Sequence, residues 1–568
     1  MKVDLIIENV KIFNVYFKKF IEGNVAILNG KFFHTYKEGE DTDLESSEII
    51  QGDGKYMIPG LIDIHMHIES SMTTAFQFTH AVKKFGVTTV VADPHEIANV
   101  YGIEGIKEFM NLDLNLPIDV FYGIPSSVPS TNSELETTGG QIGPKDVFEL
   151  FKDPKVLCIG EVMNFKDLIQ DGNSQINQII SIAKKHNINT PIEGHCPKID
   201  GLDLSRYLYQ GVLGDHTQQS VESLEEKIGK GMFIELQEKS MNADNMRYLI
   251  ENKLYEHFAL VTDDVMADRL LDGHLDRLIK KAISYGMPQE MAIYVSTYTP
   301  ARRMGLLDRG AIAPGKIADF ILLEDIKQFK IHSVYKSGQI IYKNGDLVYR
   351  DSVNRFPENY YNSMKINKIC EEDFKIKLEG SYVQCRVIKI NENSTFTKEV
   401  VESIKVTNGI LDFEDSDCGM IAVFNRYNIN SNVALGLVKG PIMKKGAVAT
   451  TWAHDHHNLM VMGRNIEDMV IAANKVIELH GGYVVSSDKK VIAALELKVA
   501  GIISDERIDY VGLKLKKVRE ALKYLGYKHN NEIMSFSTLS LPVSPEIKIT
   551  DKGLIRVKTQ EIVDLIVK

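Results

Sequence analysis

The sequence predicts an α/β protein built on a TIM-like (β/α)8 barrel, with a small β-sandwich domain from both flanks and a C-terminal mixed α/β domain. Two observations predict the barrel: eight short apolar segments alternate with helical stretches, and they do so over roughly 250 residues, the usual size of such a barrel. A third observation, apolar–polar alternation on both sides of this region, predicts the small β-domain.

The predicted small β-domain comes first along the chain. Residues 3–36 alternate apolar and polar side chains, a pattern typical of half-buried strands. The pattern ends at Pro59-Gly60, a pair that marks a turn, and returns in GAIAPGKIADFILLED after the barrel region. We therefore predict one β-domain from residues 1–57 and 312–351.

The barrel is predicted over residues 58–311. Its strand candidates are largely continuous apolar runs, which fit a parallel sheet covered on both faces. They are 60–67, 87–96, 119–128, 156–162, 190–196, 212–217, 232–237 and 258–264. From residue 352 an Asn-rich, linker-like stretch leads into a third, mixed α/β domain at 352–568.

Composition excludes several classes of function. The 568 residues carry a formal net charge of -11, which argues against a nucleic-acid-binding surface. Five scattered cysteines without a CxxC pair argue against a disulfide framework. We find no signal peptide and no apolar run long enough to span a membrane. We expect a cytoplasmic protein with a small-molecule partner, and we leave open whether it is a homo-oligomer.

Metal-ligand residue types gather where the predicted barrel strands end, which is where active sites of such barrels lie. The first strand ends in His-Met-His, and alternate residues of a strand face the same way, so both imidazoles face the barrel mouth. Four later strands also end in an acid or a histidine. The candidates are His65, His67, Glu161, His195, His216, Asp263 and Asp264.

Imidazoles and carboxylates together suit zinc, manganese, iron or nickel. Six ligands are too many for one tetrahedral ion with an open position, but they suit two ions that share a carboxylate, with water between them. Glu161 is the candidate for that shared ligand. Each residue alone has an ordinary structural explanation, such as a helix N-cap for Asp263-Asp264. Five strand ends together favour a metal centre.

Several segments resemble the amidohydrolase superfamily: PGLIDIHMH, the later His195 and His216, Thr262-Asp263 and APGKIADFILL. Within it the chain is similar, over nearly its whole length, to the bacterial-type adenine deaminase family. The segments that carry this similarity are HIESSM (67–72), ADPHEIANV (92–100), GEVMNF (160–165), EGHCP (193–197), GDHT (214–217) and AHDHHNLMVMG (453–463).

The resemblance implies a metal-bearing barrel that converts adenine to hypoxanthine and ammonia. It implies manganese or iron, whereas ligand chemistry alone also permits zinc. Glu161 stands where many superfamily members carry a carboxylated lysine. Glu193 departs from the Asp that related sequences often have before Gly-His, so no role is assigned to it.

The expected mechanism uses a water made nucleophilic by two divalent ions to attack C6 of adenine. The catalytic residues would be Asp263, which takes the proton of the water and passes it to the leaving amino group, and the bridging Glu161. The ions would be held by His65, His67, Glu161, His195, His216 and Asp263.

Four further residues are candidates for binding substrate. Asp93, His95 and Glu96 could read ring nitrogens or supply a proton near N1, although Asp-Pro also favours a simple turn. Asp264 could accept a hydrogen bond from a ring N–H, or cap the next helix.

The C-terminal His454, Asp455, His456 and His457 allow three interpretations: a loop that covers the active site, an accessory metal site, or a polar surface loop.

Two other functions are compatible with parts of this pattern. Another amidohydrolase, such as a cyclic amidase or a different aminohydrolase, would share the ligand set and differ only in substrate. A non-catalytic scaffold is disfavoured because the ligand set is intact. The HxE and PCxxC signature of the smaller zinc nucleobase deaminases is absent.

Overall fold

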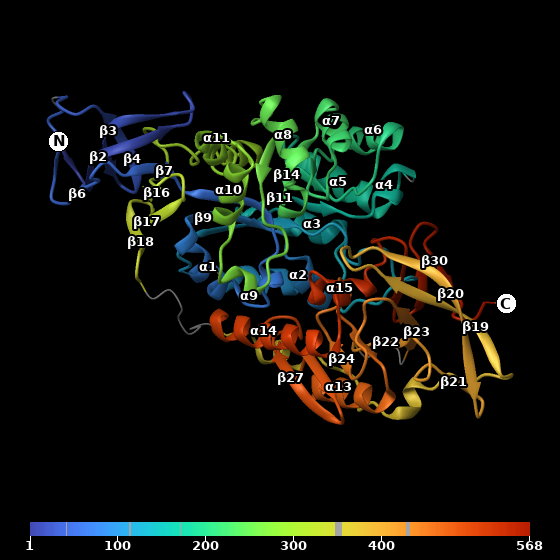
Figure 1. Cartoon of the computed structure of the whole chain (residues 1–568). Helices are drawn as coiled ribbons and strands as arrows, with labels where there is room; N and C mark the ends of the chain where they lie inside the picture. The colour runs from blue at the N-terminus through green and yellow to red at the C-terminus, as the bar shows by residue number, and fades with distance from the viewer. Residues whose placement is uncertain (41, 113–114, 171, 347–354, 428–431, 568) are drawn as a thin grey trace.

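The computed structural model describes residues 1–40, 42–112, 115–170, 172–346, 355–427 and 432–567. Eight parallel strands form the central barrel (Figure 1). They are β8 (Leu61–Met66), β9 (Val87–Ala92), β10 (Asp119–Ile124), β11 (Val156–Val162), β12 (Ile192–Gly194), β13 (Gly214–Asp215), β14 (Phe233–Leu236) and β15 (Phe258–Leu260). All eight lie within the predicted segments.

The strands pair in sequence order, and two contacts close the ring. The first five strands form one parallel sheet and the last three form another. The amide of Leu213 donates to the carbonyl of Ile192 at 3.1 Å, which joins β12 to β13. The amide of Asp263 donates to the carbonyl of His65 at 3.1 Å, so the last strand meets the first. The predicted (β/α)8 barrel is confirmed.

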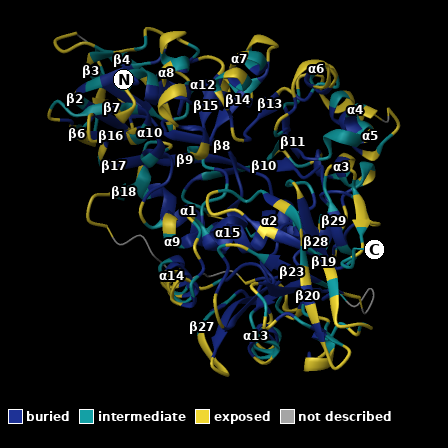
Figure 2. Ribbon diagram, turned by 45° about the vertical axis from the view of Figure 1, so that its right-hand side comes forward, coloured by how far each residue is buried: buried dark blue, intermediate teal, exposed yellow. Residues whose placement is uncertain are grey.

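A helix follows each barrel strand and covers its outer side. These helices are α1 (Ala75–Val82), α2 (His95–Asn111), α3 (Pro144–Leu150), α5 (Gln175–His186), α6 (Gly201–Tyr209), α7 (Val221–Gly229), α8 (Ala243–Glu251) and α10 (Leu275–Ser284). Several begin at a side chain that accepts from a backbone amide two or three positions into the helix, as Ser174, Ser220 and Asn242 do. Strands β8 and β9 are buried at every residue, and the other barrel strands are buried at most or all of theirs (Figure 2).

Both flanks of the barrel contribute to one small β-domain. An eight-stranded sheet has the order β18-β17-β16-β7-β2-β3-β4, with β6 (Ile49–Gln51) beside β2, and a two-stranded ribbon pairs β1 (Lys2–Val3) with β5 (Glu45–Ser46). The strands of the main order are β2 (Leu5–Asn14), β3 (Lys19–Leu28), β4 (Lys31–Tyr36), β7 (Tyr56–Pro59), β16 (Phe320–Asp325), β17 (Lys330–Lys336) and β18 (Gln339–Lys343). The flanks join where Ile321 pairs with Ile58.

The domain boundaries placed at 57/58, 311/312 and 351/352 stay predictions. Strand β7 runs across the first of them, and the last falls at 347–354, outside the described residues.

The third domain is built on a nine-stranded sheet of order β21-β20-β19-β23-β22-β25-β24-β26-β27. Its strands are β19 (Tyr382–Ile390), β20 (Thr397–Thr407), β21 (Ile410–Asp412), β22 (Gly419–Phe424), β23 (Val433–Lys439), β24 (Ala447–Thr450), β25 (Leu459–Gly463), β26 (Gly482–Ser487) and β27 (Lys490–Glu496). Helices α13 (Ile466–Glu478), α14 (Ile508–Leu525) and α15 (Glu532–Ser537) accompany the sheet, and β28 (Ile547–Thr550), β29 (Gly553–Arg556) and β30 (Glu561–Val563) form a small second sheet.

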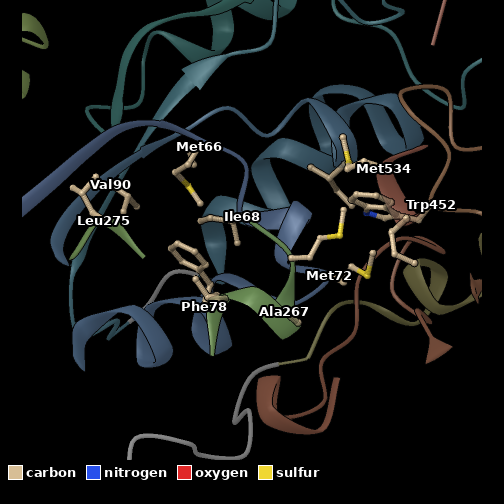
Figure 3. Packing of buried hydrophobic residues seen from close by; sticks show 14 of the residues in the cluster. Met66, Ile68, Met72, Phe78, Val90, Ala267, Leu275, Trp452 and Met534 are labelled. Carbon is tan, nitrogen blue, oxygen red and sulfur yellow. The ribbon is translucent and has the colours of Figure 1, made fainter. Parts of the chain in front are cut away.

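One hydrophobic core runs from the barrel into the third domain. Figure 3 shows members from both parts, among them Met72 of the barrel and Trp452 and Met534 of the third domain. Backbone contacts reinforce the junction: the amide of Ser504 donates to the carbonyl of Met72 at 2.9 Å. Burial of shared apolar surface therefore holds the third domain against the barrel.

Two expectations from the sequence concern membrane-spanning segments and disulfide bonds. In the described part of the chain, no helix is both long and apolar enough to cross a bilayer. All five cysteines are free thiols, and four of them are buried.

Candidate metal centre and active site

The six predicted metal ligands lie together at the carboxyl ends of the barrel strands. Nε2 of His67 is 3.6 Å from Oε1 of Glu161 and 3.5 Å from Oδ1 of Asp263. Nδ1 of His195 is 2.7 Å from Oε2 of Glu161, and Nε2 of His216 is 3.3 Å from the same oxygen. The spatial convergence predicted from the strand ends is therefore present.

Glu161 lies between two groups of imidazoles. One of its oxygens faces His67, and the other faces His195 and His216. Two triads that contain Glu161, one with His65 and His67 and one with His195 and His216, each bring three ligand atoms within 4.8 Å of one another. This is the placement that a carboxylate shared by two cations requires.

The chemistry of this donor set fits divalent cations. The rings of His65 and His216 stack with centroids 3.9 Å apart, and Nδ1 of His195 is 3.1 Å from Nε2 of His216. Nε2 of His65 and Nδ1 of His216 are buried and have no hydrogen-bond partner among the described residues. Buried lone pairs that converge without enough hydrogens to share are costly, and a cation removes that cost.

Neighbouring groups orient the two imidazoles of the His-Met-His segment. Nδ1 of His67 lies 3.0 Å from the carbonyl oxygen of Asp93, which leaves Nε2 facing the cluster. Nδ1 of His65 lies 3.6 Å from Oε2 of Glu235, a fully buried acid on β14. A hydrogen-bonded outer partner such as the Asp93 carbonyl determines which ring nitrogen is free to bind a metal. Glu235 lies just beyond hydrogen-bond distance of His65.

Sequence reasoning missed Glu235. The available signal was a single acid inside the otherwise apolar strand FIEL. Burial, followed by the nearby carboxylate of Glu193, raises the pKa of Glu235 well above its usual range. Glu193 itself does not reach the six-residue cluster by any described contact; it pairs with Arg303 at 2.7 Å.

Asp263 adopts an unusual backbone conformation at the point where the barrel closes. Its φ is +57°, in the left-handed region that non-glycine residues seldom occupy. Such conformations cost about 1–3 kcal/mol and cluster at functional sites. The following residue, Asp264, accepts a hydrogen bond from the hydroxyl of Ser70.

Asp93 and His95 lie directly beside Glu161. Oδ2 of Asp93 accepts a hydrogen bond from the amide of Glu161 at 2.9 Å, and burial raises the pKa of Asp93 to about 7. Nδ1 of His95 lies 3.6 Å from Oε1 of Glu161, and burial lowers the pKa of His95 to about 4. His95 is therefore a neutral imidazole at physiological pH.

Glu96 turns toward the third domain. Its Oε2 contacts Nε2 of His457, and its Oε1 is 3.0 Å from Nδ1 of His454. Asp455, between them in sequence, places Oδ1 3.9 Å from Nε2 of His95. His456 differs from its neighbours, because its Nδ1 accepts from the amide of Asn458 within the loop.

The loop residues His454, Asp455, His456 and His457 are each at most 4% exposed. The interpretation of this segment as a polar surface loop is therefore wrong. The loop instead packs against the barrel mouth.

A (β/α)8 barrel with imidazoles and carboxylates on the carboxyl ends of its first, fourth, fifth, sixth and eighth strands defines a metal-dependent amidohydrolase. Residues 56–341 match the model of the amidohydrolase family, and residues 394–561 match that of the adenine deaminase C-terminal domain. An adenine deaminase of Clostridium perfringens is 59% identical over the full length of both chains. An adenine deaminase 2 of Oenococcus oeni is 48% identical, over 100% of this chain and 99% of its own. The chain belongs to the adenine deaminase family.

Proposed function

We propose that the protein hydrolyses adenine to hypoxanthine and ammonia. The observation that carries the proposal is the placement of Glu161 between two groups of imidazoles at the barrel mouth. The full-length similarity to adenine deaminases, including their C-terminal domain, supports adenine as the substrate. The alternative, a cyclic amidase or another aminohydrolase of the same superfamily, finds no support in the matches to both domains.

The proposed centre takes two divalent ions, held by His65, His67, Glu161, His195, His216 and Asp263. When bound, the ions supply a nucleophile at neutral pH by lowering the pKa of a coordinated water. Manganese or iron follows from the family resemblance, and the imidazole–carboxylate set also suits zinc.

Asp263 is proposed to move the proton. Its Oδ1 lies 3.5 Å from His67 and 3.9 Å from His65, so the carboxylate borders the ligand cluster. It is only 6% exposed, which limits proton exchange with bulk water. In this position it can accept a proton from the attacking water and donate it to the amino group that leaves C6.

The proposed substrate contacts are Asp93, His95, Glu96 and Asp264. Asp93 and His95 border Glu161 on the β9 side, and Asp264 is held by Ser70. Glu96 would contact the substrate while its carboxylate stays paired with His454 and His457. These acids and the neutral imidazole can accept from, or donate to, the ring nitrogens of a purine.

The test is incubation of metal-loaded protein with adenine, with hypoxanthine measured by chromatography and ammonia by a coupled assay. We expect both products in equal amounts. Cyclic amides serve as the comparison: turnover of a cyclic amide with no turnover of adenine would overturn the proposal.

A further inference from the structure

The third domain reaches the active site through one loop, residues 451–458, between β24 and β25. The loop is fixed by hydrogen bonds on both sides. The hydroxyls of Ser537 and Ser540 donate to the carbonyls of Trp452 and His454 at 2.8 and 2.9 Å. On the barrel side, Nδ2 of Asn458 donates to the carbonyl of Thr137 at 2.8 Å. The loop is thus hydrogen-bonded both to its own domain and to the barrel.

Two imidazoles of this loop hold Glu96 and leave Asp455 facing inward. His454 and His457 both contact the Glu96 carboxylate. Asp455 is 3% exposed, and its Oδ1 is 3.9 Å from Nε2 of His95. The other nitrogen of the His95 ring is 3.6 Å from Glu161. A single imidazole therefore separates Asp455 from the bridging position of the candidate metal centre.

The carboxylate of Asp455 lacks the partners that a buried acid needs. Its Oδ2 is buried without a hydrogen-bond partner among the described residues. A buried acceptor left in this state costs about 1–3 kcal/mol. Burial, followed by the nearby Glu96 carboxylate, also raises the pKa of Asp455 well above its usual range. No described lysine or arginine forms an ion pair with it; the groups nearest to it are the neutral imidazole of His95 and the imidazole of His454, each 3.9 Å away. A ligand that brings an N–H donor would remove this cost.

We propose that Asp455 is a substrate-recognition residue supplied by the third domain, and that its unpartnered carboxyl oxygen accepts a hydrogen bond from the N–H of the five-membered ring of the purine. This inference rests on the proposed function. In the proposed orientation, C6 of the purine faces the ligand cluster and the five-membered ring faces the 451–458 loop. A free base carries an N–H on that ring, whereas a base substituted at N9 does not. Asp455 would therefore favour free bases over N9-substituted purines.

The experiment compares Asp455→Ala and Asp455→Asn with the wild-type holoenzyme. We measure kcat and KM for adenine, and the inhibition constants of hypoxanthine and 9-methylhypoxanthine. In Asp455→Ala we expect KM and the hypoxanthine inhibition constant to rise about 10-fold, the loss expected for one buried hydrogen bond. Asp455→Asn keeps a neutral acceptor, so its effect should be smaller.

Discrimination between the two inhibitors is the readout that a structural role would not produce. The wild type should bind hypoxanthine more tightly than its 9-methyl derivative, and Asp455→Ala should lose most of that preference. Bound metal should stay at the wild-type level in both variants.

The matched control is Asp468→Asn, a buried third-domain acid whose oxygens bond Asn465 and the amide of Lys489. Its KM and inhibition constants should equal those of the wild type.

The proposal is overturned if a folded Asp455 variant keeps the wild-type KM and inhibitor preference, or if its activity falls in step with lost metal. Failure of the proposed function looks different, since the wild type itself would then not produce hypoxanthine.

Discussion

Two clusters of acids and histidines meet at the barrel mouth, and they differ in where their members come from and in how many ligand-type side chains converge. In the ligand cluster, four imidazoles and two carboxylates direct lone pairs at one another. In the second cluster, which we call the Glu96 clamp, one carboxylate sits between His454 and His457. The first set gathers six ligand-type side chains in the arrangement that two cations require, whereas the second joins a single barrel carboxylate to two imidazoles of the third domain.

The protonation states of the clamp follow from this pairing. Burial acts to raise the pKa of Glu96, but His454 and His457 outweigh it and hold the pKa well below its usual range. Burial acts to lower the pKa of His454, but Glu96 outweighs it and raises that pKa to about 9. The clamp is thus an internal ion pair that joins the barrel to the third domain.

Removal of metal should show the difference between the ligand cluster and the Glu96 clamp most clearly. Chelation should abolish adenine turnover, because the water would lose its activation. It should also lower the unfolding temperature, since an ion that binds only the folded state stabilises it. Activity assays and thermal scans before and after addition of manganese, iron or zinc measure this. Full activity in metal-free protein would show that the ligand cluster does not hold a metal needed for turnover.

Glu161→Gln should have the largest effect of any single substitution considered. Loss of the shared ligand should reduce kcat/KM about 1,000-fold, corresponding to several kcal/mol of transition-state stabilisation. Bound metal, measured by elemental analysis, should fall below two ions per chain. A variant that retains both ions and the wild-type rate would show that Glu161 does not bridge them.

Glu96→Gln tests the clamp. Removal of the charge leaves protonated His454 without its partner, so we expect a loss of about 3 kcal/mol in the free energy of unfolding. Metal content should remain at the wild-type value, in contrast to Glu161→Gln. Denaturant titration and elemental analysis give the two quantities, and a variant as stable as the wild type would contradict the clamp.

The clamp should also depend on pH with a defined sign. The raised pKa of His454 gives stability that is complete below its ordinary value of 6.5 and lost as pH rises through about 9. The lowered pKa of Glu96 gives stability that is complete above its ordinary value of 4.5 and lost in acid. The stability difference between wild type and Glu96→Gln should therefore be greatest between these two ordinary values.

Glu235→Gln should have the smallest effect. Its carboxylate lies 3.6 Å from Nδ1 of His65, so the substitution should loosen the orientation of one ligand and weaken metal affinity about 10- to 100-fold. Titration of metal into the apoprotein measures this. Glu136→Gln is the matched control, because that buried acid bonds Ser130 and Thr131. Equal metal affinities in the Glu235→Gln and Glu136→Gln variants would show that Glu235 does not support the metal centre.

Much of the candidate site follows from local pattern. Apolar runs at regular spacing predict the barrel, and the period of two in His65-Met66-His67 places both imidazoles on one face. The ends of parallel strands share one edge, so Glu161, His195 and His216 could be brought together without coordinates. Glu235 escaped this reasoning because its partner is determined by the pairing of strands around the closed ring.

The amino-acid sequence by itself determined the barrel, the set of ligand types at its strand ends and the family, because these depend on periodicity and on residues close in the chain. Only the tertiary structure decided that Glu96 belongs with His457, 361 residues away, and that Asp455 faces the active site. The packing of the third domain creates those contacts. That packing depends on the complementary shapes of two buried surfaces, which no local pattern in either segment encodes.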